Sequence, residues 1–391
     1  MDLLIKNGNV FYKNKFQQIN ILVDDKKNIK YTKHIKLKPN TKIINAGNLT
    51  IIPGLIDVHT HLRQPGYEYK GTIKTETKAA SVGGFTTICC MPNTKPIIDS
   101  VSELKKIKLL INKNGIINVL PYCSITVNEQ GKQIVDIKKT SSHCIAFSDD
   151  GCGIKDSSIM KQAMKQIEST NKVIACHCEI DGSETKEVIR NIELAKQTKC
   201  KLHICHVSTK SSIDVIKKAK KQKINVTCEV TPHHLLLNKD DIKDNGAYKM
   251  NPPLSSKQDQ SSLLKAIKDG TINMIVTDHA PHSDKEKNCN YQKSLNGIVG
   301  LETSFSLMYT KLVKSKIITL EKLVELMSIN PNKRFDLNQQ SNNLTIVDLN
   351  QKYKIDSHKF FSKSKISPFN NWEVYGKIKY TIVNGKIVYS N

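Results

Sequence analysis

The stretch Asp57-Val58-His59-Thr60-His61-Leu62-Arg63 follows an apolar lead-in over residues 49–56 and places two histidines two residues apart. On a β-strand, alternate side chains lie on the same face, so His59 and His61 point the same way. Two imidazoles on one face at the end of a strand can form half of a metal site. Arg63 adds a cation to that face, in a chain with only three arginines. A lone His-x-His is more often structural, so the other half of a metal site must come from elsewhere.

The composition is that of a soluble globular protein. The 391 residues are 38% hydrophobic and 25% charged, and no apolar run approaches the ~18 residues that span a bilayer. The N-terminus from Met1 to Gly8 has the pattern of a strand entering a turn rather than that of a signal peptide, so we expect a cytoplasmic protein. Eleven cysteines without a Cys-x-x-Cys pair indicate reduced, packed thiols and not a disulfide framework.

The formal charge of +24 raises the question of a nucleic-acid partner. Nucleic-acid modules usually concentrate Arg and Lys on one element and interleave aromatic side chains for stacking. Here the excess is almost all lysine and is spread along the whole chain. We therefore expect no nucleic-acid or membrane partner, and only a general attraction of small dianionic metabolites.

Eight apolar segments predict short buried strands, at residues 54–61, 85–91, 117–125, 144–148, 173–178, 201–207, 225–231 and 272–277. Helical patterns lie between them: one starts at the capping box Ser100-Val101-Ser102-Glu103, and others span 157–168, 184–196 and 211–221. Strands that alternate with helices predict parallel βαβ units. Eight such units predict an α/β protein with a closed (β/α)8 TIM-type barrel, whose chemistry lies at the carboxyl ends of the strands.

The two chain ends have a different pattern from this middle part. Ile5 to Tyr12 and Ile382 to Tyr389 both alternate apolar residues around Asn-Gly, a pair typical of the type I′ turn of a two-residue hairpin. We therefore expect hairpins in residues 1–52 and 341–391 that pack together as a small β-sandwich domain. The barrel would then occupy residues 53–340.

Histidines and aspartates gather at the ends of the predicted strands. Strand one ends in His59 and His61, strand four in Asp149-Asp150, strand five in His177, strand six in His206 and strand eight in Asp278. Four histidines and two carboxylates at converging strand ends match the ligand set of a two-metal hydrolase. In such a site a carboxylate on strand four can bridge two cations held ~3.5–4 Å apart.

These motifs resemble those of the cyclic amidohydrolases, and within them the bacterial dihydroorotases whose bridging ligand is an aspartate. The resemblance covers nearly the whole chain and is carried by residues 57–66, 83–87, 91–94, 147–151, 205–208, 229–234, 250–254, 277–282 and 297–300. It implies the reversible conversion of N-carbamoyl-L-aspartate into L-dihydroorotate and water, a step of pyrimidine synthesis. It also implies two divalent cations per subunit, with zinc as the expected metal.

The resemblance implies a role for each polar residue. His59, His61 and Asp278 would bind the first metal, His177 and His206 the second, and Asp150 would bridge both, because the family's bridging carboxylate directly precedes a glycine. Asp278 would act as general base and then general acid. The expected substrate contacts are Arg63, Asn93 and His282 for the carboxylate, Asn251 and the backbone at Gly297 for the ring amide, and also His61 and Asn296. Relatives more often carry an aromatic residue at the position of Asn296.

The remaining polar residues are expected to play supporting parts. Asp149 would satisfy backbone donors, Asp57 would orient a ligand or serve the fold, and His279 is left undecided. The rest of the expectations concern histidines: His233 and His234 would support ligands from behind, His143 and His203 would be core or supporting groups, and His34 and His358 would lie on the surface. The polar segment 283–295 is predicted to be a mobile lid, because little apolar burial holds it down.

Two other functions remain as alternatives. A hydantoinase, dihydropyrimidinase or allantoinase commonly bridges its metals with a carboxylated lysine from strand four, but no lysine follows Asp149-Asp150 before Lys155. A non-catalytic scaffold for aspartate transcarbamoylase would have lost metal ligands that this chain keeps. The sequence leaves open a homodimer and an association with aspartate transcarbamoylase. The stretch between His177 and His206 is shorter than the resemblance would lead us to expect.

Overall fold

The computed structural model describes residues 2–33, 38–179 and 182–391, which leaves His34 outside the described part. Its centre consists of eight parallel strands: β8 (Leu55–Thr60), β9 (Phe85–Cys90), β10 (Asn118–Pro121), β11 (Ala146–Phe147), β12 (Val173–Cys176), β13 (Lys201–Ile204), β14 (Val226–Val230) and β15 (Met274–Ile275). The strands pair in the orders β10-β9-β8 and β11-β12-β13-β14-β15. Each falls within one of the eight predicted segments.

Isolated bridges join the two ladders into a closed barrel. Cys123 pairs with Phe147 on one side, and Thr60 pairs with His279 on the other. Asp57 strengthens the second seam, because its carboxylate accepts the backbone N–H of His59 at 3.0 Å and that of Thr277 at 2.9 Å. Both expectations for Asp57 stay predictions, because it bonds the backbone of a proposed ligand as well as that of a neighbouring strand. Burial raises the pKa of Asp57 to about 7, against the effect of these hydrogen bonds.

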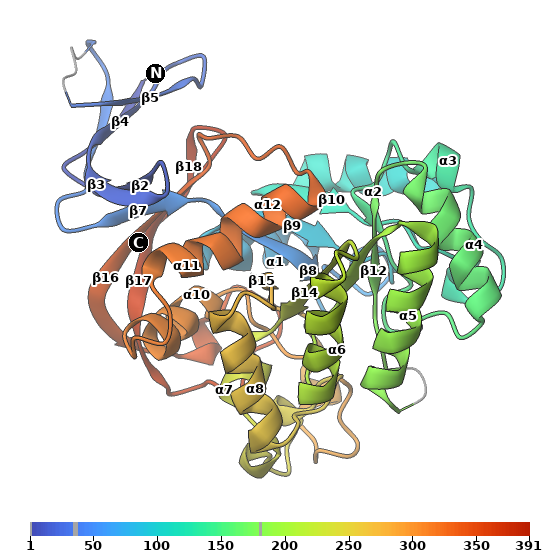
Figure 1. Ribbon diagram of the computed structural model, residues 1–391. Coiled ribbons are helices and arrows are strands. Elements are labelled where there is room, and N and C mark those ends of the chain that lie inside the picture. Colours follow the sequence, from blue (N-terminus) through green and yellow to red (C-terminus); the bar gives the residue numbers. More distant parts are fainter. Residues whose placement is uncertain (1, 34–37, 180–181) are drawn as a thin grey trace.

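Helices surround the barrel and alternate with its strands (Figure 1). They are α1 (Ile73–Val82), α2 (Val101–Asn114), α3 (Ile137–Thr140), α4 (Ser157–Glu168), α5 (Glu184–Thr198), α6 (Lys210–Lys221), α7 (Pro232–Leu236), α8 (Lys257–Lys268), α10 (Ser304–Met308), α11 (Leu320–Val324) and α12 (Asn330–Phe335). In α4 the buried residues Met160, Ala163, Met164 and Ile167 recur at helical spacing and face the barrel core. The (β/α)8 architecture predicted from the sequence is confirmed.

The helix starts follow the capping chemistry of the sequence. Asp156 caps α4 by accepting the N–H groups of Ser158 and Ile159. At α2 only half of the predicted capping box forms. Ser100 accepts the N–H of Glu103, whereas the Glu103 carboxylate pairs with Lys106 at 2.6 Å. No helix within the described ranges is long and apolar enough to cross a membrane.

The chain ends form two sheets beside the barrel, where both termini lie in Figure 1. One sheet has the order β5 (Ile29–Thr32), β4 (Asn20–Val23), β1 (Leu3–Lys6), β6 (Lys42–Asn45). The other has the order β18 (Lys386–Ser390), β17 (Glu373–Val383), β16 (Leu344–Lys354), β7 (Thr50–Pro53), β2 (Asn9–Tyr12), β3 (Lys15–Gln18). Their apolar faces share a core that includes Ile5, Ile21, Ile51, Ile346 and Ile382.

One of the two predicted hairpins is confirmed and the other is wrong. Strands β17 and β18 pair antiparallel across Asn384 and Gly385, whose φ angles of 50° and 73° suit a type I′ turn. Strands β1 and β2, by contrast, lie in different sheets. A Cβ on Gly8 would lie 2.0 Å from Ile51 Cδ1, so this glycine serves a close approach of the backbone to Ile51 and not a hairpin turn.

The division into residues 1–52, 53–340 and 341–391 remains our proposal for the domain boundaries. Strand β7 ends at Pro53, β8 begins at Leu55 and β16 begins at Leu344. The connection between β16 and β17 leaves the sandwich, however, and contacts the barrel. There the N–H of Phe361 donates to Glu302 at 2.8 Å. The barrel and the sandwich therefore share an interface that a cut at residue 341 would not describe.

Candidate metal centre and substrate pocket

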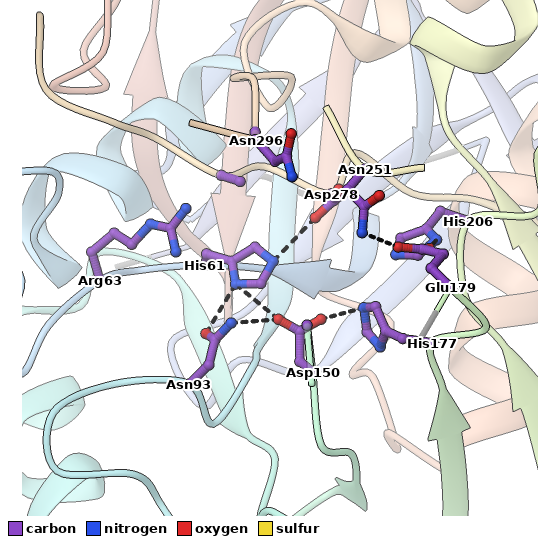
Figure 2. Close-up of a pocket in the computed structure, with 13 residues that line it drawn as sticks. His61, Arg63, Asn93, Asp150, His177, Glu179, His206, Asn251, Asp278 and Asn296 are labelled. Carbon is purple, nitrogen blue, oxygen red and sulfur yellow. Dashed lines mark hydrogen bonds and ion pairs between the residues drawn. The ribbon is translucent and has the colours of Figure 1, made fainter. Parts of the chain in front are cut away.

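A polar pocket of about 240 Å³ opens at the carboxyl ends of the barrel strands (Figure 2). Its lining contains ten of the twelve predicted site residues: His61, Arg63, Asn93, Asp150, His177, His206, Asn251, Asp278, Asn296 and Gly297. The other two lie directly against this set. His59 is fully buried next to His61 and His177, and His282 contacts Arg63. The structure thus brings all twelve residues together, while their individual roles remain predictions.

The four ligand candidates of strands one, five and six form one imidazole cluster. The ring centroids of His59 lie 5.6 Å from His61, 5.1 Å from His177 and 5.2 Å from His206, and His177 lies 4.6 Å from His206. Strands from both halves of the barrel supply these side chains, because parallel strands present their carboxyl ends on the same rim of a barrel.

Two carboxylates lie among these rings. Asp150 Oδ1 is 3.5 Å from His59 Nε2 and contacts His177 Nε2, while Asp150 Oδ2 is 3.4 Å from His61 Nδ1. Asp278 Oδ1 is 3.4 Å from His59 Nε2 and 3.1 Å from His61 Nε2. Asp150 therefore reaches histidines of both proposed ligand groups, as a bridging carboxylate has to.

The residues present fit a metal site. The ligand atoms of His59, His61 and Asp150 all lie within 4.8 Å of one another, as do those of His59, His177 and Cys205. Among the described residues, the buried atoms His59 Nε2 and His177 Nδ1 have no hydrogen-bond partner. Buried polar atoms without partners are costly, and imidazole nitrogen and carboxylate oxygen are the donors that zinc prefers.

The electrostatics keep both aspartates ionised. Burial would raise the pKa of Asp278, but the charges of His59 and His61 outweigh it and hold that pKa far below its usual range. Burial would also raise the pKa of Asp150, but the charges of His177 and His61 outweigh burial and hold this pKa well below its usual range. Metal ligands must be deprotonated, so both side chains are in the required form at neutral pH.

Asp149 faces a different part of the barrel. Its Oδ1 accepts the N–H groups of Ile125 at 2.7 Å and Thr126 at 3.0 Å, as expected for a carboxylate that satisfies backbone donors. Burial raises its pKa to about 6. Of the two adjacent aspartates, Asp150 is the one that lies among the imidazoles.

A basic group lies at the other end of the pocket. Arg63 donates from Nε to Pro281 O at 3.0 Å, and its Nη2 lies 3.3 Å from His282 Nε2. Lys70, which sequence analysis missed, places Nζ 3.3 Å from His282 Nδ1. An ammonium only donates, so Nδ1 accepts and the His282 proton sits on Nε2, 2.7 Å from Asn296 O. Burial, then Arg63 and Lys70, lower the pKa of His282 to about 3 and keep the ring neutral.

The backbone of Gly297, expected to contact the ring amide of the substrate, has only one polar group free to do so. Gly297 has φ of +130°, and a Cβ there would lie 2.8 Å from Ala280, so only glycine fits this position. Its N–H donates to Lys249 O at 3.0 Å. Of its two backbone polar groups, the carbonyl is therefore the one that can serve a ring amide.

Glu179 lines the pocket and was not assigned a role from the sequence. Its Oε1 lies 2.9 Å from His206 Nδ1, and its Oε2 accepts the side-chain N–H of Asn251, as Figure 2 shows. Burial would raise the pKa of Glu179, but the neighbouring His206 outweighs burial and lowers it. Glu179 follows His177 by two residues, so the same spacing rule that groups His59 with His61 would have found it.

The other histidines differ in burial and in how many of their ring nitrogens have partners. Both ring nitrogens of His234 are engaged, by Thr231 and by Pro252 O, and those of His279 are engaged by Glu76 and the Gly300 N–H. His279 therefore serves the fold. His233 is buried, and its Nε2 has no partner among the described residues. His358 is exposed, as expected.

Residues 283–295, predicted to be a mobile lid, are held down more firmly than their polar composition predicts. The first turn of this segment is the helix α9 (Asp284–Lys287), and Lys287 is only 2% exposed. Lys287 Nζ donates to Lys249 O at 3.1 Å and to Leu295 O at 2.9 Å. The segment is thus anchored by a buried polar side chain rather than loosely held, and its mobility stays a prediction.

Comparison with known proteins agrees with this geometry. A family profile described as "Dihydro-orotase-like" matches residues 48–198. Proteins named dihydroorotase from Staphylococcus aureus (strain Mu50) and Fusobacterium nucleatum are 42% and 40% identical to this chain. The alignments cover 98% of both chains in the first case, and 99% of this chain and 98% of the relative in the second. Among solved structures, the L-hydantoinase (dihydropyrimidinase) from Arthrobacter aurescens matches all of this chain and 96% of its own, with a TM-score of 0.91 and 25% identity.

The barrel, its His/Asp pocket and these matches define an amidohydrolase, a TIM-barrel hydrolase that acts on cyclic amides. The hydantoinase match extends to the whole architecture, but its sequence identity is well below that of the curated relatives. The chain belongs to the dihydroorotase family.

Proposed function

We propose that this chain catalyses the reversible, metal-dependent conversion of N-carbamoyl-L-aspartate into L-dihydroorotate and water, in the synthesis of UMP. The observation that supports this most directly is one pocket with a metal-ligand cluster at its base and Arg63 and Asn93 on its wall. A cyclic amide with a carboxylate substituent fits this pocket, because its amide can face the metal-ligand cluster while its carboxylate faces Arg63 and Asn93. The planar guanidinium of Arg63 suits that carboxylate.

The metals would be two zinc ions per subunit. His59, His61 and Asp278 would hold one, His177 and His206 the other, and Asp150 would bridge them. Bound divalent cations supply a water nucleophile that is deprotonated at neutral pH and stabilise the oxyanion that develops on the amide carbonyl.

The chain's own residues would then bind substrate and move one proton. Arg63 and Asn93 would hold the carboxylate. His282 was expected to join them, but its Nε2 proton is donated to Asn296 O, so we assign it to the pocket wall beside Arg63 instead. Asn251 and the Gly297 carbonyl would orient the ring amide. Asp278 would take the remaining proton of the attacking hydroxide and deliver it to the amide nitrogen as the C–N bond breaks, because its carboxylate is ionised and points into the pocket.

The cellular location of the enzyme and its protein partners are also part of the proposal. We place it in the cytoplasm, and a homodimer and an association with aspartate transcarbamoylase are the two assemblies that the sequence leaves open. Light scattering of the purified chain, alone and with a transcarbamoylase, tests both associations. A monomer that is unchanged by the transcarbamoylase would remove this part and leave the catalytic proposal intact.

The decisive experiment combines metal analysis with a substrate panel. Purified enzyme should bind close to two zinc ions per chain, cyclise N-carbamoyl-L-aspartate, and hydrolyse dihydroorotate far faster than hydantoin or dihydrouracil. Equal rates on the uncarboxylated rings would favour a hydantoinase. Bound metal without any amidase activity would favour a scaffold.

A further inference from the structure

Behind the proposed metal ligands lies a second polar cluster, made of the buried Glu229 and His203 and the half-buried Thr227. Glu229 Oε1 is 2.5 Å from His59 Nδ1, and its Oε2 is 2.8 Å from His203 Nε2. The other nitrogen of His203 lies 2.9 Å from the Thr227 hydroxyl. Glu229 and His203 are at most 1% exposed, so neither touches solvent.

A carboxylate only accepts hydrogen bonds, and this fixes the protons of both neighbouring rings. His59 must carry a proton on Nδ1 to bind Glu229, so the nitrogen left for a metal is Nε2, which lies 3.5 and 3.4 Å from Asp150 and Asp278. That Nε2 atom is the one without a hydrogen-bond partner among the described residues. Glu229 therefore decides which nitrogen of His59 can bind a metal.

The same carboxylate also reaches the second ligand group. The backbone N–H of His206 donates to Glu229 Oε1 at 3.2 Å. His206 has a φ of 25°, a backbone conformation that L-residues rarely adopt and that needs support from its surroundings. One buried carboxylate on β14 thus holds the ring of a ligand from strand one and the backbone of a ligand from strand six.

We propose that Glu229 is a positioning residue of the metal centre, which sets the tautomer of His59 and the backbone of His206 and is itself held by His203. This inference rests on the metal site proposed above and adds a residue that contacts neither metal nor substrate. Hydrogen-bond partners behind metal ligands typically contribute 10–100-fold to metal affinity, because they orient the ligand ring and fix its lone pair.

The test uses Glu229→Gln in the full-length protein. Glutamine keeps the size but offers one acceptor and one donor, so it cannot accept from both imidazoles. We expect zinc affinity, measured by competition with a chromophoric chelator, to fall by about 10–100-fold. In the metal-free protein, the NMR signal of the hydrogen-bonded Nδ1–H proton of His59 should move upfield or disappear, because a neutral amide is a weaker acceptor than a carboxylate.

Glu76→Gln is the matched control. Glu76 and His279 form a similar buried pair, 2.8 Å apart, that contacts none of the proposed metal ligands by side chain. Both variants should lower the melting temperature of the metal-free protein, but only Glu229→Gln should weaken zinc binding. Equal zinc affinity in Glu229→Gln and wild type, with only the melting temperature lowered, would make Glu229 a purely structural residue and overturn the inference.

Two further outcomes are separable. Should Glu229→Gln not fold, His203→Gln is the second variant: its amide can still donate to Glu229, so zinc affinity should be retained, and a full loss of zinc binding would contradict the arrangement. Should the wild type itself fail to bind zinc, the proposed metal site fails. The Nδ1–H signal of His59 in the metal-free protein would still test the role of Glu229 by itself.

Discussion

The side-chain amide of Asn93 donates to Oδ2 of Asp150 at 2.5 Å. The Asn93 carbonyl oxygen in turn lies 3.0 Å from His61 Nδ1. A residue proposed to bind the substrate carboxylate therefore also touches the proposed bridging ligand and one further metal ligand. Substrate recognition and metal binding share a side chain at this point, so they should not be separable by mutation there.

Asn93→Ala should raise KM for dihydroorotate by about 10–100-fold, the usual effect of losing a hydrogen bond to a charged group, and should also weaken zinc binding. Steady-state kinetics and chelator competition measure the two effects. Asn118→Ala is the control, because Asn118 lies at the opposite end of a barrel strand, next to Asn384. A raised KM with unchanged metal affinity would show that the contact with Asp150 contributes nothing.

Asp150→Ala should abolish activity and reduce the metal content, because removing the shared carboxylate leaves two cations close together without a bridging charge. Asp149→Ala should mainly reduce stability, since Asp149 binds backbone N–H groups of residues 125 and 126. Metal analysis, activity and thermal melting of both variants check this. An inactive Asp149→Ala beside an active, metal-replete Asp150→Ala would reverse our assignment.

Asp278→Asn keeps an oxygen for the metal but cannot take up a proton. Turnover should fall by ~10²–10⁴-fold, the usual scale for loss of a general base, while zinc content should fall much less. Rates at saturating substrate and metal analysis on the same preparation test this. Near-normal turnover would remove the proton-transfer role from Asp278.

Arg63→Lys retains the charge and loses the planar two-pronged geometry, so the KM for dihydroorotate should rise. Arg63→Ala should raise it further, while leaving the slow hydrolysis of uncarboxylated rings unchanged. The measurement compares the steady-state kinetics of each variant on dihydroorotate and on an uncarboxylated ring. An equal loss on both substrates would mean that Arg63 supports the fold and not the recognition of a carboxylate.

Lys287 should make stability depend on pH. Burial lowers its pKa to about 7, while the unfolded chain keeps an ordinary lysine pKa near 10.4. Between these values the unfolded state binds more protons, so this group's contribution to the free energy of unfolding increases by about 2 kcal/mol from pH 7 to pH 9. Urea unfolding at both pH values should show this increment as a difference between wild type and Lys287→Met. Taking the difference cancels the opposing titration of the buried cysteines, and parallel curves would contradict the shift.

Apolar runs in the sequence predicted all eight barrel strands, because strands buried on both faces leave a continuous hydrophobic signal. The ends were less predictable. Residues 272–277 were expected to be a strand, but β15 covers only Met274–Ile275, since the chain soon reaches Asp278 with a positive φ of 47°. The residues that form the pocket end the regular strand, so the apolar pattern locates the strand but not the residue at which it stops.

The ligand candidates could be found from their places at the strand ends together with the family resemblance, whereas their supports could not. Glu229 sits in a strand otherwise rich in apolar residues, and nothing in its neighbours indicates that it faces His59, 170 residues away. Lys70 is one lysine among many, and its contact with His282 depends on how two distant loops meet. Contacts between segments far apart in the chain are set by the assembled barrel.

The six-stranded sheet joins opposite ends of the chain, with Thr50 paired to Val347 and Ile51 paired to Ile346. During synthesis on the ribosome, β7 therefore has no partner on this side until almost the whole barrel has been made. In that interval its edge presents free backbone donors and acceptors, and such edges pair readily with other chains. Once β16 has been synthesised it can pair with β7 and cover this edge, so the edge is then closed to other nascent copies of the chain.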